Sequence, residues 1–274
     1  MDSRTRWGTW ILMVALCSGC RTRHPDMSST INEIGVSRTR AGDAPAGISA
    51  RQFVSASSLV RVRTGDIEAD ATPETIIELG DGRGVEIRDA SGARLRQLPT
   101  TGYVTDFGTV ATPGSDKQQL VLYTYPNANR RGTFSVVTAD GQERARWDEA
   151  PAPGGFAVGQ WGGAPALFYL QDDRLAVQSP QGGRITTLSA PQGGFFTTRA
   201  VRTIASGRTV VLASGNGYTP YHVVCVYDAG GRLVFEEVGD EQAFELEGSG
   251  ESDEFFVLTR SSRWRFNTST ARPG

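Results

Sequence analysis

The sequence predicts an all-β fold, and the architecture it favours is a β-propeller of about five four-stranded blades. Beyond residue 48 the chain consists of short apolar or alternating runs separated by Gly, Pro, Asp and Asn, which is typical of strands joined by tight turns. No stretch there has the sustained helical period of a long helix. Similar hairpins recur at spacings of roughly 40 to 50 residues, which is the repeat length of a propeller blade.

Four of these hairpins share the same turn chemistry. In each, an apolar run leads into a turn that contains Asp or Ser followed by Gly, and a second run returns from the turn. Such residues tolerate the backbone conformations of a tight β-turn. The four hairpins span residues 85–95, 134–144, 175–185 and 223–233.

Five apolar runs are predicted to form the second strand of each blade. They are Thr75–Leu79, Gln119–Tyr123, Pro165–Leu170, Thr209–Ala213 and Glu254–Thr259. The fifth blade has a third strand at residues 264–266 and then only a polar tail, so residues 51–57 are expected to supply its outer strand and protect the exposed edge. An incomplete propeller or an open β-sandwich is the alternative interpretation.

The first twenty residues have the pattern of a secretory signal peptide. Arg4 and Arg6 precede an apolar run, residues 10–16, that is far shorter than the roughly 20 residues a membrane span requires. Residues 17–20 resemble the lipobox of bacterial lipoproteins, which implies cleavage before Cys20 and acylation of that cysteine. Plain secretion is the alternative.

These features predict the order of the domains and the location of the protein. Residues 1–19 form the signal peptide, 20–48 the lipidated cysteine with a flexible polar tether, 49–268 the propeller domain and 269–274 a polar tail. The protein is therefore expected to be exported and anchored by its N-terminal lipid to the envelope membrane, on the periplasmic side of an outer membrane or at the cell surface.

Charge and cysteine content narrow the function further. Removal of residues 1–19 takes away two arginines and one aspartate, so the net charge of −2 becomes −3. The chain has no basic stripe, which argues against a nucleic-acid partner. Cys17 leaves with the signal peptide and Cys20 carries the lipid, so Cys225 has no partner for a disulfide. Its apolar setting, residues 223–227, predicts a buried strand in which the thiol acts as a small hydrophobe.

One acidic loop carries the clearest motif of the globular part. Residues 65–77 read GDIEADATPETII and resemble the calcium-binding loop of FG-GAP/VCBS propeller repeats. Over roughly residues 59–266 the chain resembles the family only in the spacing of its strands and turns. It implies calcium as the cofactor, with five ligands: Asp66, Glu68, Asp70, the Thr72 carbonyl and Glu74. Acidic oxygens at alternate positions of a tight loop suit a hard cation.

The loop departs from the family pattern at two positions. Ala69 and Ala71 stand where the family has glycine, the residue that most easily adopts positive φ. The alternative interpretation is therefore a repeat that has kept the shape of the loop and lost the ion.

No residue is predicted to be catalytic. His24 lies in the tether, so His222 is the only histidine in the domain. One histidine is too few for a multi-histidine metal site and leaves a serine triad no choice of base. An extracytoplasmic enzyme of the hydrolase, lyase or quinoprotein type on a propeller scaffold is the alternative class, because fold by itself does not fix function.

Two long connections between second and third strands predict a recognition surface for a protein or glycan. Exposed aromatic, amide and arginine side chains on loops are common in such surfaces. The residues are Tyr125, Asn127, Asn129, Arg130 and Arg131 in one connection, and Tyr218, Tyr221 and His222 in the other. The function predicted is an envelope binding or scaffold protein; the alternative is that these long loops are simply tolerated.

Overall fold

The computed structural model describes the domain in ten segments, all of which belong to one compact unit, residues 55–274. The described residues are 61–112, 117–125, 131–149, 154–172, 174–189, 197–214, 221–241, 243–248, 250–259 and 263–267. Cys20, the tether, the proposed outer strand at residues 51–57 and the polar tail lie outside them. Within the described residues, no helix is long and apolar enough to cross a membrane.

The described strands form five antiparallel sheets, and within each sheet the strands follow in chain order. Blade 1 contains β1 (Val62–Gly65), β2 (Glu74–Glu78), β3 (Gly84–Arg88) and β4 (Arg94–Pro99). Blade 2 contains β5 (Tyr103–Ala111), β6 (Gln118–Tyr125), β7 (Gly132–Val137) and β8 (Glu143–Glu149). Blade 3 contains β9 (Phe156–Trp161), β10 (Ala164–Gln171), β11 (Arg174–Gln178) and β12 (Arg184–Ser189).

The last two blades complete the set. Blade 4 contains β13 (Thr197–Thr203), β14 (Thr209–Ser214), β15 (His222–Tyr227) and β16 (Leu233–Gly239). Blade 5 contains β17 (Ala243–Gly248), β18 (Glu254–Thr259) and β19 (Arg263–Asn267), so three of its strands are described. The predicted second strands coincide with β2, β6, β10, β14 and β18, and the all-β propeller prediction is confirmed.

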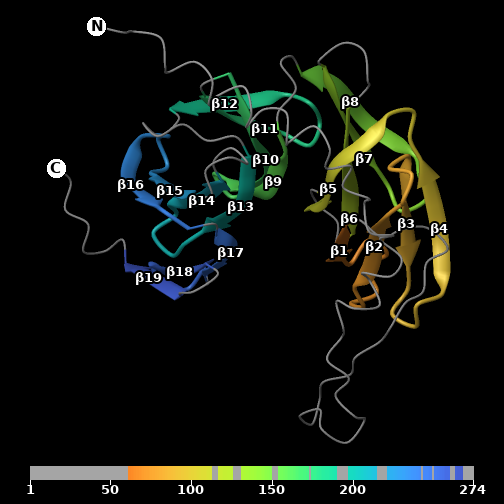
Figure 1. Ribbon diagram of the computed structural model, residues 1–274, viewed down its shortest axis with the longest axis horizontal. Coiled ribbons are helices and arrows are strands. Elements are labelled where there is room, and N and C mark those ends of the chain that lie inside the picture. The colour runs from red at the N-terminus through yellow and green to blue at the C-terminus, as the bar shows by residue number, and fades with distance from the viewer. Residues whose placement is uncertain are drawn as a thin grey trace, which may run out of the picture. The chain divides into compact units, whose positions relative to one another are not determined.

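The first strands of successive blades lie next to one another. Contacts join β1 to β5, β5 to β9, β9 to β13 and β13 to β17. Figure 1 shows these first strands toward the centre of the domain, with β4, β8, β12 and β16 at its periphery. This radial order is the arrangement of propeller blades.

The four predicted hairpins join the third and fourth strands of blades 1 to 4. Each contains a glycine at positive φ: Gly92 at 88°, Gly141 at 83°, Gly182 at 90° and Gly231 at 85°. Each also has a register shift at the end of the third strand. A turn that closes on a left-handed glycine with a β-bulge explains why the Asp/Ser and Gly pattern recurs in the sequence.

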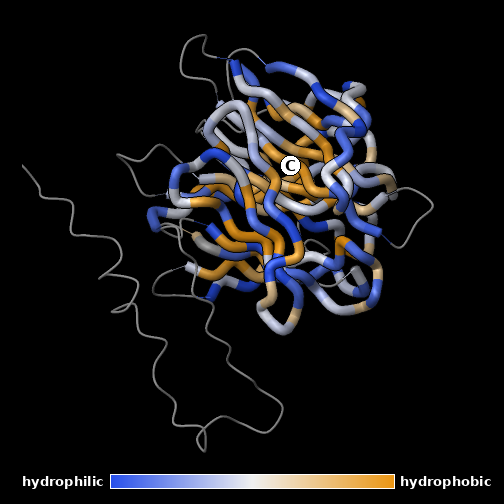
Figure 2. Tube along the Cα trace, turned by 90° about the vertical axis from the view of Figure 1, so that its right-hand side faces the viewer, coloured by the Kyte–Doolittle hydropathy of each residue, from blue (hydrophilic) through white to orange (hydrophobic). Residues whose placement is uncertain are grey.

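The apolar core is divided among the junctions between blades. Four buried clusters join blades 1 and 2, 2 and 3, 3 and 4, and 4 and 5, respectively. In blades 1 to 4 the second and third strands are largely buried on both faces, as the run of buried residues in β14 and β15 shows. The third strand of blade 5, β19, is mostly exposed. Figure 2 shows the apolar segments concentrated inside the domain.

Cys225 belongs to one of these clusters. It lies in β15 with no exposed surface, so the prediction of a buried strand is confirmed. Burial raises the pKa of its thiol to about 12, which leaves the group protonated at neutral pH.

Phe134 is the residue on which the junction between blades 2 and 3 is centred. Its ring lies 4.6 Å from that of Tyr123 and 5.1 Å from that of Trp147, both in blade 2. It lies 5.5 Å from the ring of Phe156 and 4.9 Å from that of Tyr169, both in blade 3. The side chain is fully buried.

The Phe134→Ala variant should lower the free energy of unfolding by about 3 to 5 kcal/mol, because it leaves a cavity between two blades. Urea unfolding followed by tryptophan fluorescence measures the change. The control is Leu95→Ala, since Leu95 is 43% exposed and its loss should cost less than about 0.5 kcal/mol. Equal effects of the two variants would contradict a core located between the blades.

Candidate functional site

The predicted acidic loop connects β1 to β2 at the inner side of blade 1. The Asp66 carboxylate accepts hydrogen bonds from two backbone N–H groups, that of Asp70 at 3.2 Å and that of Ala71 at 3.1 Å. The Glu74 carboxylate accepts a hydrogen bond of 2.7 Å from the N–H of Ile67. These bonds fold the loop back on itself, with both acidic side chains on its inner side.

Three of the predicted ligands come together in this loop. One carboxylate oxygen from each of Asp66, Asp70 and Glu74 lies within 4.8 Å of the other two. Glu74 is buried, Asp66 is half-buried and Asp70 is exposed, so the group opens to solvent on one side. Carboxylate oxygens are the donors that calcium prefers, and the set therefore fits a hard divalent cation.

The other two predicted ligands are Glu68 and the carbonyl oxygen of Thr72. Glu68 is exposed and its carboxylate does not belong to the group. Thr72 is also exposed, and its N–H donates a hydrogen bond of 2.8 Å to Asp70. Calcium binding by the loop remains a prediction.

The two alanines that replace family glycines adopt the conformation that glycine favours. Ala69 has φ of 61° and Ala71 has φ of 63°. The left-handed conformation costs a residue with a Cβ roughly 1 to 2 kcal/mol. The hydrogen bonds of Asp66 and Glu74 therefore maintain the loop against the preference of its own backbone.

The structure describes only part of the predicted recognition surface. Tyr125 ends β6 and is half-buried, whereas Arg131 precedes β7 and is exposed. Tyr221 precedes β15, is half-buried and packs against the cluster between blades 3 and 4. Asn127, Asn129, Arg130 and Tyr218 lie outside the described residues.

The prediction that His222 belongs to the recognition surface is corrected by the structure, because its side chain is buried. The residue is 3% exposed at the start of β15. Its Nδ1 lies 2.7 Å from the carbonyl oxygen of Glu241, and its ring covers Gly239 so closely that an added Cβ there would meet the ring at 2.1 Å. The pairing of His222 with Gly239 depends on the register of β15 and β16, which no local pattern in the sequence shows.

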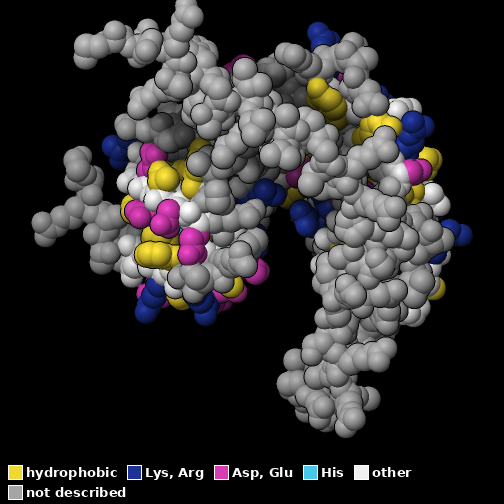
Figure 3. Space-filling view, viewed as in Figure 1, with side chains coloured by type: hydrophobic (Ala, Val, Ile, Leu, Met, Phe, Trp, Pro, Cys, Tyr) yellow, Lys and Arg dark blue, Asp and Glu magenta, His cyan; other side chains and the backbone are white. Residues whose placement is uncertain are grey.

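An acidic patch lies beside this histidine. Figure 3 shows acidic side chains gathered over β16 and β17. The exposed members of this stretch are Glu237, Asp240 and Glu245, and the outer strand β16 carries the first of them. The patch makes this side of blade 4 anionic.

Asp106 is a half-buried carboxylate that no pattern in the sequence indicates. It lies on β5 and accepts hydrogen bonds from the N–H of Phe107 at 3.0 Å and from the N–H of Phe156, at the start of β9, at 3.2 Å. Arg61 and Arg63, at the start of blade 1, lie 4.0 and 3.8 Å from it. Burial raises the pKa of the Asp106 carboxyl, while the Phe156 N–H and the two arginines oppose this shift. One side chain thus contacts three blades.

A second polar cluster joins blades 2 and 3. Glu149, at the end of β8, is 7% exposed and accepts hydrogen bonds from the Tyr169 hydroxyl and the Gln171 amide. The Arg184 guanidinium lies 3.2 Å from the same carboxylate and contacts the Tyr169 ring. Burial and the neighbouring Glu149 raise the pKa of the Tyr169 hydroxyl. Every member of the cluster has a partner, as expected of a structural bridge.

Comparison with solved structures supports the propeller fold. In a crystal structure of BBS1N in complex with ARL6DN, the matched chain is 12% identical, with a TM-score of 0.53 over 80% of this chain and 68% of that chain. In Kuenenia stuttgartiensis hydrazine synthase the identity is 15% and the TM-score 0.52, over 70% of this chain and 53% of that chain. At identities this low, the structural similarity shows the fold alone and says nothing about activity. No protein-family model and no curated protein matches the chain.

The strain in the acidic loop can be measured with Ala71→Gly. Glycine removes the cost of positive φ and adds conformational entropy to the unfolded chain, so the variant should be stabilised by a net of about 0.5 to 1 kcal/mol. That corresponds to a rise in Tm of about 1 to 4 °C. The control Ala111→Gly, at the exposed end of β5, should lower the Tm. A fall in Tm for Ala71→Gly would show that the loop does not hold this residue at positive φ.

Proposed function

We propose that this protein is a lipid-anchored binding or scaffold module of the cell envelope, built on a β-propeller. The observation that carries the proposal is the placement of the two long connections, β6–β7 and β14–β15, at corresponding positions in blades 2 and 4. Corresponding connections of propeller blades emerge on the same face, so a partner can contact both at once. The N-terminal pattern of residues 1–20 supports export and anchoring through Cys20.

The described ends of these connections support a recognition role. Arg131 and Tyr125 are the described ends of the connection in blade 2, where Arg131 is exposed and Tyr125 is half-buried. Tyr221 is half-buried at the end of the connection in blade 4. Arginine and tyrosine are enriched at protein interfaces, because each combines a large contact area with a hydrogen-bonding group. The polar tether of residues 21–48 would let the domain reach a partner away from the membrane surface.

A crosslinking experiment in native membranes tests this function. The full-length protein and its Arg131→Glu variant are crosslinked in intact cells, and the adducts are compared by mass spectrometry. We expect the main adduct of the wild-type protein to fall several-fold in Arg131→Glu and to persist in Arg174→Glu, a control at an exposed position on β11. Cys20→Ser should move the protein out of the membrane fraction. An adduct that is unchanged in Arg131→Glu, or a Cys20→Ser protein that stays in the membrane, would refute the corresponding part of the proposal.

We also propose that calcium binds the acidic loop through Asp66, Asp70 and Glu74. The support is the convergence of their oxygens together with the likeness of the loop to FG-GAP/VCBS repeats. Three carboxylates gathered without a cation repel one another, so an ion there would offset the repulsion and join the two ends of the loop. The chemistry it would supply is structural, since it fixes the connection between β1 and β2.

Calcium should therefore raise the Tm of the purified domain in proportion to the logarithm of its concentration. At a hundredfold excess over Kd the stabilisation is about 2.7 kcal/mol. Magnesium should act more weakly, because it demands a tighter octahedron. Asp70→Asn should abolish the calcium shift, whereas Glu143→Gln, at an exposed residue of β8, should retain it. An unchanged Tm at millimolar calcium would mean that the loop has kept its shape and lost the ion.

A further inference from the structure

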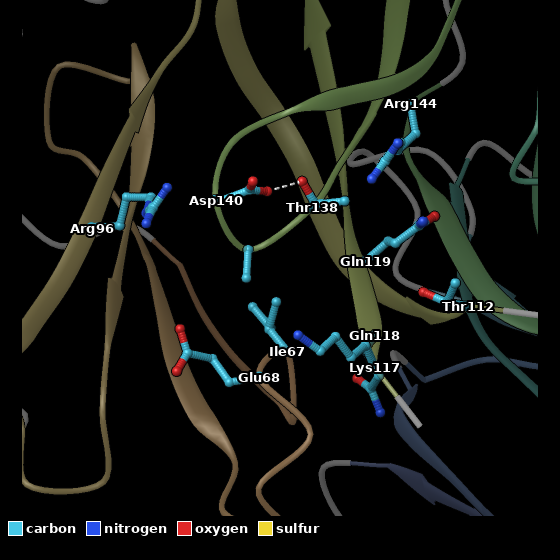
Figure 4. Close-up of a pocket in the computed structure, with 11 residues that line it drawn as sticks. Ile67, Glu68, Arg96, Thr112, Lys117, Gln118, Gln119, Thr138, Asp140 and Arg144 are labelled. Carbon is cyan, nitrogen blue, oxygen red and sulfur yellow. Dashed lines mark hydrogen bonds between the residues drawn. The ribbon is translucent and has the colours of Figure 1, made fainter. Parts of the chain in front are cut away.

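A polar cleft lies between blades 1 and 2, apart from the recognition surface described above. Its volume is about 610 Å³, within the range of roughly 300 to 1,000 Å³ that is common for small-molecule sites. Its walls come from the β1–β2 loop, β4, the start of β6 and the β7–β8 hairpin. Figure 4 shows the lining side chains around the hollow.

Positive side chains predominate in this cleft. Arg96, Lys117 and Arg144 line it together with two carboxylates, Glu68 and Asp140. The Thr138 hydroxyl donates a hydrogen bond to Asp140. This bond is the main reason why the pKa of the Asp140 carboxyl lies below its usual range. The Arg144 side chain is exposed and makes no hydrogen bond or ion pair with the described residues, so its guanidinium is available to a ligand.

The two arginines stand on different walls. Arg96 comes from β4 of blade 1 and Arg144 from β8 of blade 2. Figure 4 shows Arg96 on one side of the hollow and Arg144 with Gln119 on the other, with Asp140 and Ile67 between them. A guanidinium binds a carboxylate through two parallel hydrogen bonds. A ligand that has one acidic group near each end can therefore contact both walls.

The remaining lining groups suit hydroxyls. Gln118, Gln119 and Thr112 offer amides and a hydroxyl, while Ile67 and Ala139 are the apolar side chains among the lining residues. The Oε1 of Gln118 is buried close to Gly65 and accepts no hydrogen bond from the described residues. With so little apolar surface, the cleft offers little to a hydrophobic ligand.

We propose that this cleft binds a short acidic saccharide, namely a uronic-acid disaccharide that carries a carboxylate on each sugar. Arg96 and Arg144 bind the two carboxylates. The side chains of Gln119 and Thr112 contact sugar hydroxyls. The cleft requires neither the membrane anchor nor the two long connections, so its failure and the failure of the binding or scaffold function proposed above can be distinguished.

Lys117 provides a direct measurement, because it is the only lysine in the chain. Lys117 is exposed and lines the cleft, so it is the one side chain that an amine-acetylating reagent modifies. Peptide mass spectrometry distinguishes this modification from acetylation of the N-terminal amine. The full mature chain is acetylated with digalacturonate, galacturonate, lactose or inorganic phosphate present at equal concentration. We expect digalacturonate to slow the acetylation of Lys117 several-fold, galacturonate to act more weakly, and lactose and phosphate to have little effect.

Variants of the two arginines complete the test. Arg96→Gln and Arg144→Gln should each weaken binding of digalacturonate about tenfold in calorimetry, because each removes one charge-assisted contact. Arg174→Gln, an exposed residue of β11, should bind like the wild type. Both arginines of the cleft are exposed, and an unchanged Tm confirms that the variants fold.

Three outcomes would overturn the proposal. Protection by phosphate equal to that by digalacturonate would show a general anion site, and equal protection by lactose would show that the carboxylates do not matter. Absence of protection by digalacturonate would show that the cleft does not bind this class of ligand.

Discussion

The structure depends on one constraint: a four-stranded blade cannot bury both of its faces by itself. Each of the four apolar clusters is shared by two successive blades. Phe134 illustrates this, since its ring contacts two aromatic rings of its own blade and two of the next. The hydrophobic free energy of folding therefore arises between repeats, and a blade removed from its neighbours would lose most of it.

Carboxylates with little exposed surface add specificity to these junctions. Asp106 receives a hydrogen bond from blade 3 and lies near two arginines of blade 1, and Glu149 bonds to Tyr169 and Arg184 of the following blade. A buried carboxylate without partners would cost several kcal/mol. Only one relative placement of the blades satisfies these groups, whereas apolar packing by itself tolerates small shifts.

The acidic loop and the cleft occupy one region of the domain and share part of the backbone. Ile67 lines the cleft, and its N–H donates to Glu74 in the acidic group. The N–H of Gln118, also in the cleft, donates to the carbonyl oxygen of Asp66 at 3.3 Å. Positive φ at Ala69 and Ala71 shows that this region tolerates local strain, a property that concentrates at functional sites.

The sequence by itself determined the fold class, the second strand of every blade and the glycine turns of the hairpins, because strand periodicity and turn chemistry are local properties. It also singled out the loop in which Asp66, Asp70 and Glu74 meet, since these residues are close along the chain. Only the tertiary structure showed that His222 is buried, that Asp106 contacts three blades and that Arg96 and Arg144 face one cleft. Those outcomes depend on strand register and on packing between residues about 50 positions apart, and no local pattern encodes such distances.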